Sequence, residues 1–428
     1  MSDPAPTATA NEVPFKIAIL DDALALLHQK LAATRFPDEL DDAGWEYGAP
    51  LSDVHRLGMY WKDGFDWRAQ EARLNAELPM FTRDLDVEGH GTLNVHYVHK
   101  RSDVETAIPL LFVHGCEFAV LLTERVNDEG AGPGSFLEAR KILPLLTASS
   151  PDHPSFHVVA LSLPGYAFSQ APRKKGFALT QYSEVANKLM LSLGYNEYVN
   201  QGGDWGTLIT LYTAHRYGLK HVKASHVNYP VSKPPKLTTA PLQYLKHRLS
   251  WYTPVEKAGL ERSRQFVEKG RAYYLEHSTQ PQTLGYSLAD SPVGLLAWIY
   301  EKLVNWTDAY PWDDDEVLTW VSIYWFSRDG PAASIRIYYE LVKSGEAITV
   351  PRPKVPLGIS RFPKELTVPP KAWSRGMGNI VFDAEHSSGG HFAATEKPEE
   401  LVGDLRKMFG KGGPAFGVVP GKSGYIPT

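Results

Sequence analysis

The sequence predicts an α/β fold with a mostly parallel sheet that is interrupted by a helical insertion. Short continuous apolar runs at 108–115 and 156–169 have the length and composition of buried parallel strands. A helical pattern at 207–217 follows another such strand, and strands that alternate with helices are typical of a parallel sheet. Between 231 and 350 the alternation stops and the residues become helical and rich in Trp and Tyr, which predicts a lid.

The region before the sheet has a different character. Apolar positions between 17 and 36 recur at helical spacing, whereas 44–48 and 60–75 are rich in turns and aromatic residues. We therefore expect an N-terminal meander that wraps the core and the lid. The first 13 residues are small and polar, without a basic start or an apolar centre, so a disordered leader is expected instead of a signal peptide or a membrane anchor.

These patterns divide the chain into six parts. Strands resume at 355–362 and 378–385, after the lid, and the last residues are rich in Gly and Pro, which predicts a surface tail. The expected parts are a leader (1–13), a meander domain (14–90), the first part of the core (91–230), the helical lid (231–350), the second part of the core (351–412) and a C-terminal tail (413–428).

Composition excludes several classes of function. The 428 residues are 43% hydrophobic and 22% charged, as in ordinary soluble globular proteins. A net charge of −5 does not suit a nucleic acid or an anionic membrane surface, and no apolar run reaches the ~20 residues of a membrane span. The single cysteine, Cys116, excludes an intrachain disulfide framework and suits a reducing compartment, so we expect a cytoplasmic protein.

The turn Gly202-Gly203-Asp204-Trp205-Gly206 is the most informative stretch of the chain. It has the pattern of a nucleophile between small residues, which a sharp strand-to-helix turn requires, but the central residue is Asp instead of Ser. A carboxylate at this place indicates alkyl transfer to Asp204. The chemistry is therefore displacement at an epoxide or at a carbon–halogen bond.

An α/β-hydrolase places an acid and a histidine after the nucleophile, in that order. His391 follows a Gly-Gly turn after the last expected strand, with His386 as its competitor, and Glu365 follows the penultimate strand, with Asp383 in reserve. His391 would take a proton from water while Glu365 holds the imidazole. The Trp205 N–H is one candidate oxyanion donor.

A second oxyanion donor is expected in the loop after His114-Gly115, and Gly132 is our candidate. The acidic run 313–315 is attributed to the start of a helix and not to a metal site. The chemistry needs neither a metal nor a cofactor. Phe168 and Trp205 are our candidates for substrate-binding aromatic side chains.

An epoxide oxygen also needs a proton donor when the ring opens. A lid tyrosine suits this task because it is neutral at pH 7 and can donate a hydrogen bond. The candidates are Tyr273 and Tyr338, but each has an adjacent tyrosine, Tyr274 and Tyr339, and composition alone does not choose within a pair.

The order of the motifs resembles that of the epoxide hydrolases of the α/β-hydrolase fold, in particular the microsomal type with an N-terminal meander domain. The resemblance extends from about 14 to 412, and its carriers are GWEYG, YW…FDWR, LPGYAFS, GGDWG, AYYLEHSTQP, DSPVGLLAWIYEKLVNWTD, YWF, FPKEL and GGHFAA. It implies that Asp204 is the nucleophile, Glu365 the relay acid and His391 the base. It also selects Tyr273 over Tyr274 and Tyr338 over Tyr339.

The resemblance carries expectations about activity as well. The family converts epoxides to vicinal diols with water and without a cofactor, and roles in detoxification and aromatic hydrocarbon catabolism are implied. This chain is similar to the soluble members, and a homodimer is expected. The alternative chemistry is that of a haloalkane dehalogenase, which uses the same Asp and His.

The chain departs from the family at one loop. The family sequence is His-Gly-Trp-Pro-Gly-Ser, whereas here residues 116–131 separate His114-Gly115 from Gly132-Pro133-Gly134-Ser135, and the Trp is missing. One interpretation is a gene-model error, such as a translated intron. The other is a genuine insertion, which is either a tolerated surface loop or a disabling change that leaves a homologue with a scaffold or ligand-binding role.

Overall fold

The structure is a computed structural model that describes residues 12–113, 115, 133–346 and 352–427. The described residues form a nine-stranded sheet in the order β1-β2-β3-β5-β4-β6-β7-β8-β9. In chain order the strands are β1 (Val13–Phe15), β2 (Met80–Val87), β3 (Gly91–Lys100), β4 (Ile108–Val113), β5 (Phe156–Leu161), β6 (Tyr198–Gly202), β7 (Val222–Val227), β8 (Pro356–Arg361) and β9 (Asn379–Glu385).

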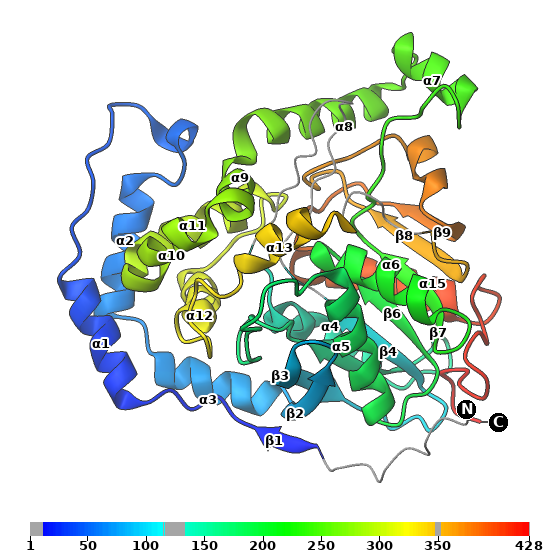
Figure 1. The fold of residues 1–428 in the computed structure, drawn as a ribbon, viewed down its shortest axis with the longest axis horizontal. Coiled ribbons are helices and arrows are strands. Elements are labelled where there is room, and N and C mark those ends of the chain that lie inside the picture. The colour runs from blue at the N-terminus through cyan, green and yellow to red at the C-terminus, as the bar shows by residue number, and fades with distance from the viewer. Residues whose placement is uncertain (1–11, 114, 116–132, 347–351, 428) are drawn as a thin grey trace.

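Helices surround this sheet (Figure 1). They are α1 (Asp21–Ala32), α2 (Leu51–Asp63), α3 (Trp67–Glu77), α4 (Ala139–Thr147), α5 (Leu179–Ser192), α6 (Trp205–Tyr217), α7 (Pro241–Arg248), α8 (Pro254–Gln265), α9 (Ala272–Thr279), α10 (Pro281–Asp290), α11 (Pro292–Asn305), α12 (Asp314–Trp325), α13 (Arg336–Ser344), α14 (Ala393–Glu396) and α15 (Pro398–Phe409).

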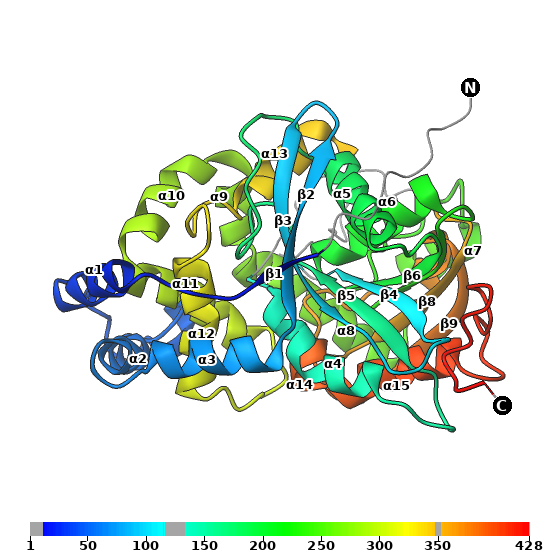
Figure 2. The same cartoon turned by 90° about the horizontal axis from the view of Figure 1, so that it is seen from below.

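The sheet is mostly parallel, as predicted. Strands β4 to β9 form a parallel set, whereas β1, β2 and β3 join it through antiparallel pairs. Helices α5 and α6 cover one face, and α4 and α15 cover the other (Figure 2). Every residue of β4 and β6 is therefore buried, which explains why these strands are apolar runs instead of alternating ones.

The sheet begins before residue 91, where we had expected it to start. Strand β2 pairs with β3 along eight residues, and β1 adds a short outer strand to β2. The sequence of β2 does not show a clear strand pattern, because Arg83, Asp84 and Asp86 lie within it and only three of its eight residues are buried. A strand near the edge of a sheet tolerates such charges, so the apolar alternation that identifies a strand is weak.

The lid consists of the helices between β7 and β8, namely α7 to α13, as the loss of alternation had predicted. The acidic run at 313–315 begins α12, where the Asp313 side chain accepts from the Glu316 N–H at 2.7 Å. This is the helix-start role that the sequence indicated. The proposed bounds of the lid at 231 and 350 stay predictions.

The N-terminal helices pack against the lid, and β1 and β2 join the sheet (Figure 1). Tyr60 of α2 donates to Asp315 of α12 at 2.8 Å, and Tyr300 of α11 donates to Asp53 of α2 at 3.1 Å. Lys30 of α1 forms an ion pair with Asp290 at the end of α10. Residues 12–87 thus contact both the lid and the sheet.

The last residues are packed against the core, although we had expected a surface tail. Gly424 accepts from Ser155 N–H and donates its own N–H to Thr106, both at 2.8 Å. The side chains of Ala415, Val419 and Tyr425 are buried. The Gly and Pro residues that suggested a loose tail serve its turns, since Gly424 has a φ of 81° and a Cβ there would lie 2.6 Å from the Cβ of Pro154.

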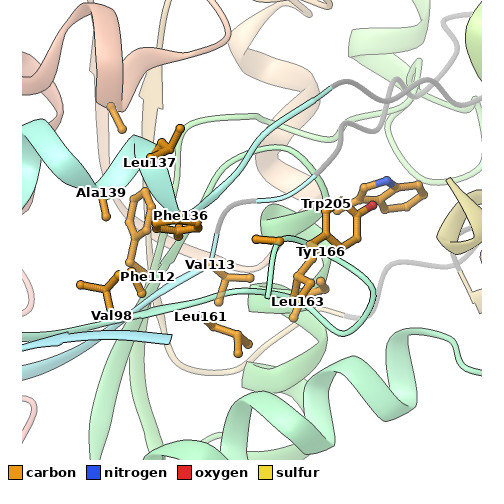
Figure 3. Close-up of a cluster of buried hydrophobic side chains, with 14 of the residues drawn as sticks. Val98, Phe112, Val113, Phe136, Leu137, Ala139, Leu161, Leu163, Tyr166 and Trp205 are labelled. Atoms are coloured by element: carbon orange, nitrogen blue, oxygen red, sulfur yellow. The ribbon is translucent and has the colours of Figure 1, made fainter. Parts of the chain in front are cut away.

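A large apolar core joins the sheet to its helices. Figure 3 shows part of it, which extends from Val98 and Phe112 on the strands to Leu163 and Trp205 beside the turn at Asp204. The candidate nucleophile is therefore held by the apolar core of the sheet. No helix in the described ranges has the length and the hydropathy that crossing a bilayer requires.

Candidate active site

Asp204 lies on a sharp turn between β6 and α6. Its φ of 61° and ψ of −139° are strained for a residue with a side chain, at a cost of about 1–3 kcal/mol. The turn brings α6 so close that a Cβ on Gly202 would lie 2.2 Å from the Gly206 carbonyl oxygen. Glycine at 202 is thus a steric requirement, and the turn projects the Asp204 carboxylate from the carboxyl end of β6.

His391 and Glu365 meet Asp204 in a buried line. The His391 Nδ1 lies 2.8 Å from Glu365 Oε1, and its Nε2 lies 3.4 Å from Asp204 Oδ2. All three side chains are at most 2% exposed. When His391 donates its Nδ1 proton to Glu365, the lone pair of Nε2 faces Asp204. A water molecule that attacks an ester on Asp204 would give its proton to this lone pair.

The reserve candidates for acid and base lie elsewhere. Asp383 accepts from Arg361 Nε at 2.8 Å, and His386 lies 2.7 Å from Asp404. The first pair joins β8 to β9, and the second joins the residue after β9 to helix α15. Of the two acids and two histidines that we considered, the structure therefore brings only Glu365 and His391 to Asp204.

The other carboxylate oxygen of Asp204, Oδ1, accepts the backbone N–H of Trp205. This N–H is the candidate oxyanion donor that the sequence suggested, and its hydrogen bond to Oδ1 is compatible with that role. The second candidate donor, Gly132, lies outside the described residues, as do Cys116 and the rest of the segment 116–131.

Both lid tyrosines lie beside this line of side chains. The Tyr338 ring of α13 meets the Trp205 ring edge to face at 5.7 Å between centroids. The Tyr273 ring of α9 lies 5.4 Å from Trp306, whose ring lies 5.5 Å from His391. Both tyrosines are at most 3% exposed, whereas Tyr339 is half-buried under Lys343. The geometry favours Tyr338 within its pair, but Tyr274 is as buried as Tyr273.

Phe168 is not brought to the candidate nucleophile. Its ring packs against Phe15 at 5.1 Å, His96 at 5.5 Å and Phe136 at 6.2 Å, in an aromatic cluster between β1, β3 and the start of α4. These contacts are those of a core residue, and a part for Phe168 in substrate binding stays a prediction.

Comparisons with known proteins agree with this arrangement. A family model described as "Epoxide hydrolase N terminus" matches residues 12–121, and one described as "alpha/beta hydrolase fold" matches 130–273. A putative epoxide hydrolase of Stigmatella aurantiaca is 37% identical over 408 residues, which cover 92% of this chain and 84% of that protein. The chain belongs to the epoxide hydrolase family.

Further members of the family show the same extent of likeness. Epoxide hydrolase 1 of Sus scrofa is 34% identical, over 96% of this chain and 91% of its own length. The solved structure of the Aspergillus niger epoxide hydrolase superposes with a TM-score of 0.79 at 33% identity, covering 93% of this chain and 96% of that one. The juvenile hormone epoxide hydrolase of Bombyx mori gives a TM-score of 0.80 at 27% identity, covering 92% and 93%.

The sequence did not identify the residues that fix the loop around His391 in this epoxide hydrolase. The Trp306 carbonyl accepts the His391 N–H at 2.8 Å, and Glu396 accepts the N–H groups of Gly390 at 2.8 Å and Asp308 at 2.9 Å. Trp306 lies within a stretch that carries the family resemblance, and Glu396 lies five residues after His391. Both residues can be read in the sequence, but the sequence does not show that the lid contacts the loop that holds His391.

Glu396 is expected to make the stability of the folded protein depend on pH. Burial, more than the nearby Glu365 charge, raises the pKa of the Glu396 carboxyl from 4.5 to about 7, against the opposing effect of the two N–H donors. The folded state therefore binds this proton more tightly than the unfolded state. The stabilisation is complete below 4.5 and is lost as the pH rises through about 7.

We therefore expect Glu396→Gln to remove part of the decline in melting temperature between about pH 5 and about pH 8. The slope of melting temperature against pH is the quantity to compare. The amide side chain has one acceptor oxygen fewer than the carboxylate, so it also lowers stability at every pH. Glu399→Gln, an exposed neighbour at the start of α15, is the control and should keep the wild-type slope. An unchanged slope in Glu396→Gln would contradict the assignment.

Proposed function

We propose that this protein converts epoxides to vicinal diols through a covalent ester on Asp204. The proposal rests on one observation: the two oxygen atoms of the Asp204 carboxylate have different contacts. Oδ2 faces His391 Nε2 at 3.4 Å, and Oδ1 accepts the Trp205 N–H. A carboxylate arranged in this way can attack with one oxygen while the other is held in the place of an ester carbonyl.

In the first step, Asp204 Oδ2 attacks one epoxide carbon and the bond from that carbon to the ring oxygen breaks. The oxygen takes a proton from Tyr273 or Tyr338, which leaves a hydroxyalkyl ester and a tyrosinate that solvent reprotonates. Burial of both tyrosines supports this role, because a hydrogen bond to a developing alkoxide is stronger where water is excluded.

In the second step, His391 takes a proton from a water molecule that attacks the ester carbon. Glu365 stabilises the imidazolium, and the Trp205 N–H stabilises the oxyanion on Oδ1. The tetrahedral intermediate then expels the alkoxide, which takes the proton from His391 and leaves as the diol. Asp204 returns as a carboxylic acid and gives its proton to solvent, which balances the proton used by the tyrosinate.

The names of the relatives support epoxide substrates. Those described above are an epoxide hydrolase or a putative one, and one is a juvenile hormone epoxide hydrolase. Diol release from styrene oxide by the purified chain tests the activity, and no diol from any of several aryl and alkyl epoxides would contradict it. A homodimer, a cytoplasmic location and roles in detoxification or aromatic hydrocarbon catabolism rest on the family resemblance and stay predictions.

The two lid tyrosines separate this proposal from haloalkane dehalogenation. We expect Tyr273→Phe combined with Tyr338→Phe to slow ester formation from styrene oxide by about 10²–10⁴-fold, because the leaving oxygen loses its proton donors. Stopped-flow measurement of the first step would show this. Halide needs no proton to leave, so a dehalogenase with the same changes would still release bromide from 1-bromobutane.

A matched control is available within the same pair. Tyr339→Phe removes the hydroxyl next to Tyr338, on a half-buried ring under Lys343, and should leave the rate of ester formation near that of the wild type. A double variant that opens styrene oxide at the wild-type rate would contradict the assignment of the tyrosines.

A further inference from the structure

A small cavity lies within the lid, next to the proposed epoxide site. Its volume is about 30 Å³, close to the space that one water molecule or one oxygen-bearing group occupies. Most of its wall is apolar, and the polar side chains of His277, Lys302 and Tyr338 also line it. Tyr338 is one of the two proposed proton donors, so the cavity borders the place where the epoxide ring would bind.

His277 is the unusual member of this wall. It lies on α9 and is 3% exposed, and neither of its ring nitrogens has a hydrogen-bond partner in the described part of the chain. Burial, aided by the charge of Lys302, lowers the pKa of His277 well below its usual value of 6.5. The imidazole is therefore neutral and offers one N–H donor and one lone pair. Each unsatisfied group carries a desolvation cost that a bound partner would remove.

The ring of His277 lies between the two lid tyrosines. Its centroid is 4.4 Å from that of Tyr338 and 5.8 Å from that of Tyr273, and both rings stand nearly perpendicular to it. In the proposed reaction, an epoxide whose oxygen contacts both hydroxyl groups would lie near His277, because the His277 ring packs against both tyrosine rings. The substituent on the epoxide carbon is the part of the substrate that reaches the cavity.

The charge in the cavity is already balanced. Lys302 forms an ion pair with Glu301 and lies over the rings of Trp298 at 4.3 Å and Tyr273 at 5.2 Å. A second carboxylate is not needed to neutralise it, and the volume suits a single oxygen atom with its attached carbon. The wall thus favours an uncharged oxygen over a carboxylate or a pure hydrocarbon group.

We propose that His277 determines substrate specificity by hydrogen bonding an uncharged oxygen on the epoxide substituent. That oxygen belongs to an ether, a hydroxyl or a carbonyl close to the ring, so oxygen-bearing epoxides such as glycidyl ethers are the preferred class. The inference rests on the proposed function, since it takes the two tyrosines as the ligands of the epoxide oxygen.

A pair of substrates of equal size tests the proposal. Glycidyl methyl ether and 1,2-epoxypentane differ by one oxygen in place of one methylene group. The ratio of their kcat/KM values, divided by the ratio of their uncatalysed hydrolysis rates, measures the contribution of the protein. We expect the wild type to favour the ether and His277→Leu to lose about 2–10-fold of this preference, the range of one neutral hydrogen bond.

Two further variants make the test specific to the imidazole nitrogens. His277→Gln keeps a donor and an acceptor and should retain part of the preference, whereas His277→Phe keeps a ring without nitrogen and should lose it as His277→Leu does. Styrene oxide has no oxygen in its substituent, so its kcat/KM in each variant measures any general effect of the substitution on the site, and the preference for the ether is read relative to it.

Two outcomes would overturn the proposal. One is a wild-type protein without preference for the ether, a result that needs no variant. The other is equal preference in the wild type and in any folded non-polar variant, which would mean that the cavity holds only water. A chain that converts neither substrate nor styrene oxide would contradict the proposed function instead, so the two failures are distinguishable.

Discussion

Replacing Asp204 with alanine is expected to lower diol formation by about 10⁴-fold or more, since the variant has no group that can form the covalent ester. The tyrosines could still polarise the epoxide and His391 could still polarise a water molecule, but neither can form the ester that links the two steps. The measurement is diol released from styrene oxide at saturating substrate, together with the intact mass of the protein to detect any ester.

The backbone at Asp204 requires a second variant beside the first. Alanine at a φ of 61° is more strained than aspartate, so part of an observed loss could come from the turn itself. Asp204→Asn tolerates this conformation and should be equally unable to form an ester at first mixing. Asp383→Ala, which removes a carboxylate paired with Arg361, is the control that should keep its activity. Normal turnover by Asp204→Ala would refute the mechanism.

The second large effect is expected from His391→Gln. Without the base, ester hydrolysis should slow by about 10²–10⁴-fold, whereas ester formation needs only Asp204 and the tyrosines and should continue. The protein would then accumulate as its hydroxyalkyl ester. Intact-mass spectrometry should show an increase equal to the mass of the epoxide, which persists long after the wild type has returned to its free mass.

His386→Gln is the matched control for this experiment. His386 lies five residues earlier in the same loop region and is bonded to Asp404, away from Asp204. It should turn over without a lasting adduct. If His391→Gln instead hydrolyses its ester at the wild-type rate, the water must be activated by another group, and the line of His391 and Glu365 would be structural.

The candidate site was largely predictable because its chemistry depends on local patterns. The turn at Asp204 needs glycine on its tight side, and the acid and the histidine are expected after strands of the parallel set, so chain order restricts each of them to two candidates. The family resemblance favoured Glu365 over Asp383, which also precedes His391 in the chain. The structure explains the choice, since Asp383 lies within β9 and is bound to Arg361.

What the sequence did not predict depends on contacts between distant segments. The buried environment of His277 depends on packing among the lid helices, and the link from Glu396 to Asp308 depends on packing of the lid against the core. The contacts of Phe168 with β1 and β3 were likewise not predicted, and its part in substrate binding stays a prediction. The segment 116–131 and Gly132 lie outside the described residues, so both interpretations of that segment stay open.

The N-terminal residues that contact both the lid and the sheet set a limit on protein engineering. Lid exchange between homologues is a common route to new substrate ranges, but here Tyr60 and Asp53 of α2 are bonded to Asp315 and Tyr300 of the lid, while β1 and β2 belong to the sheet. A chimaera that replaced the lid alone would break these bonds. The unit to graft is therefore the lid together with residues 21–77, which hold α1 to α3, and these two segments lie far apart in the gene.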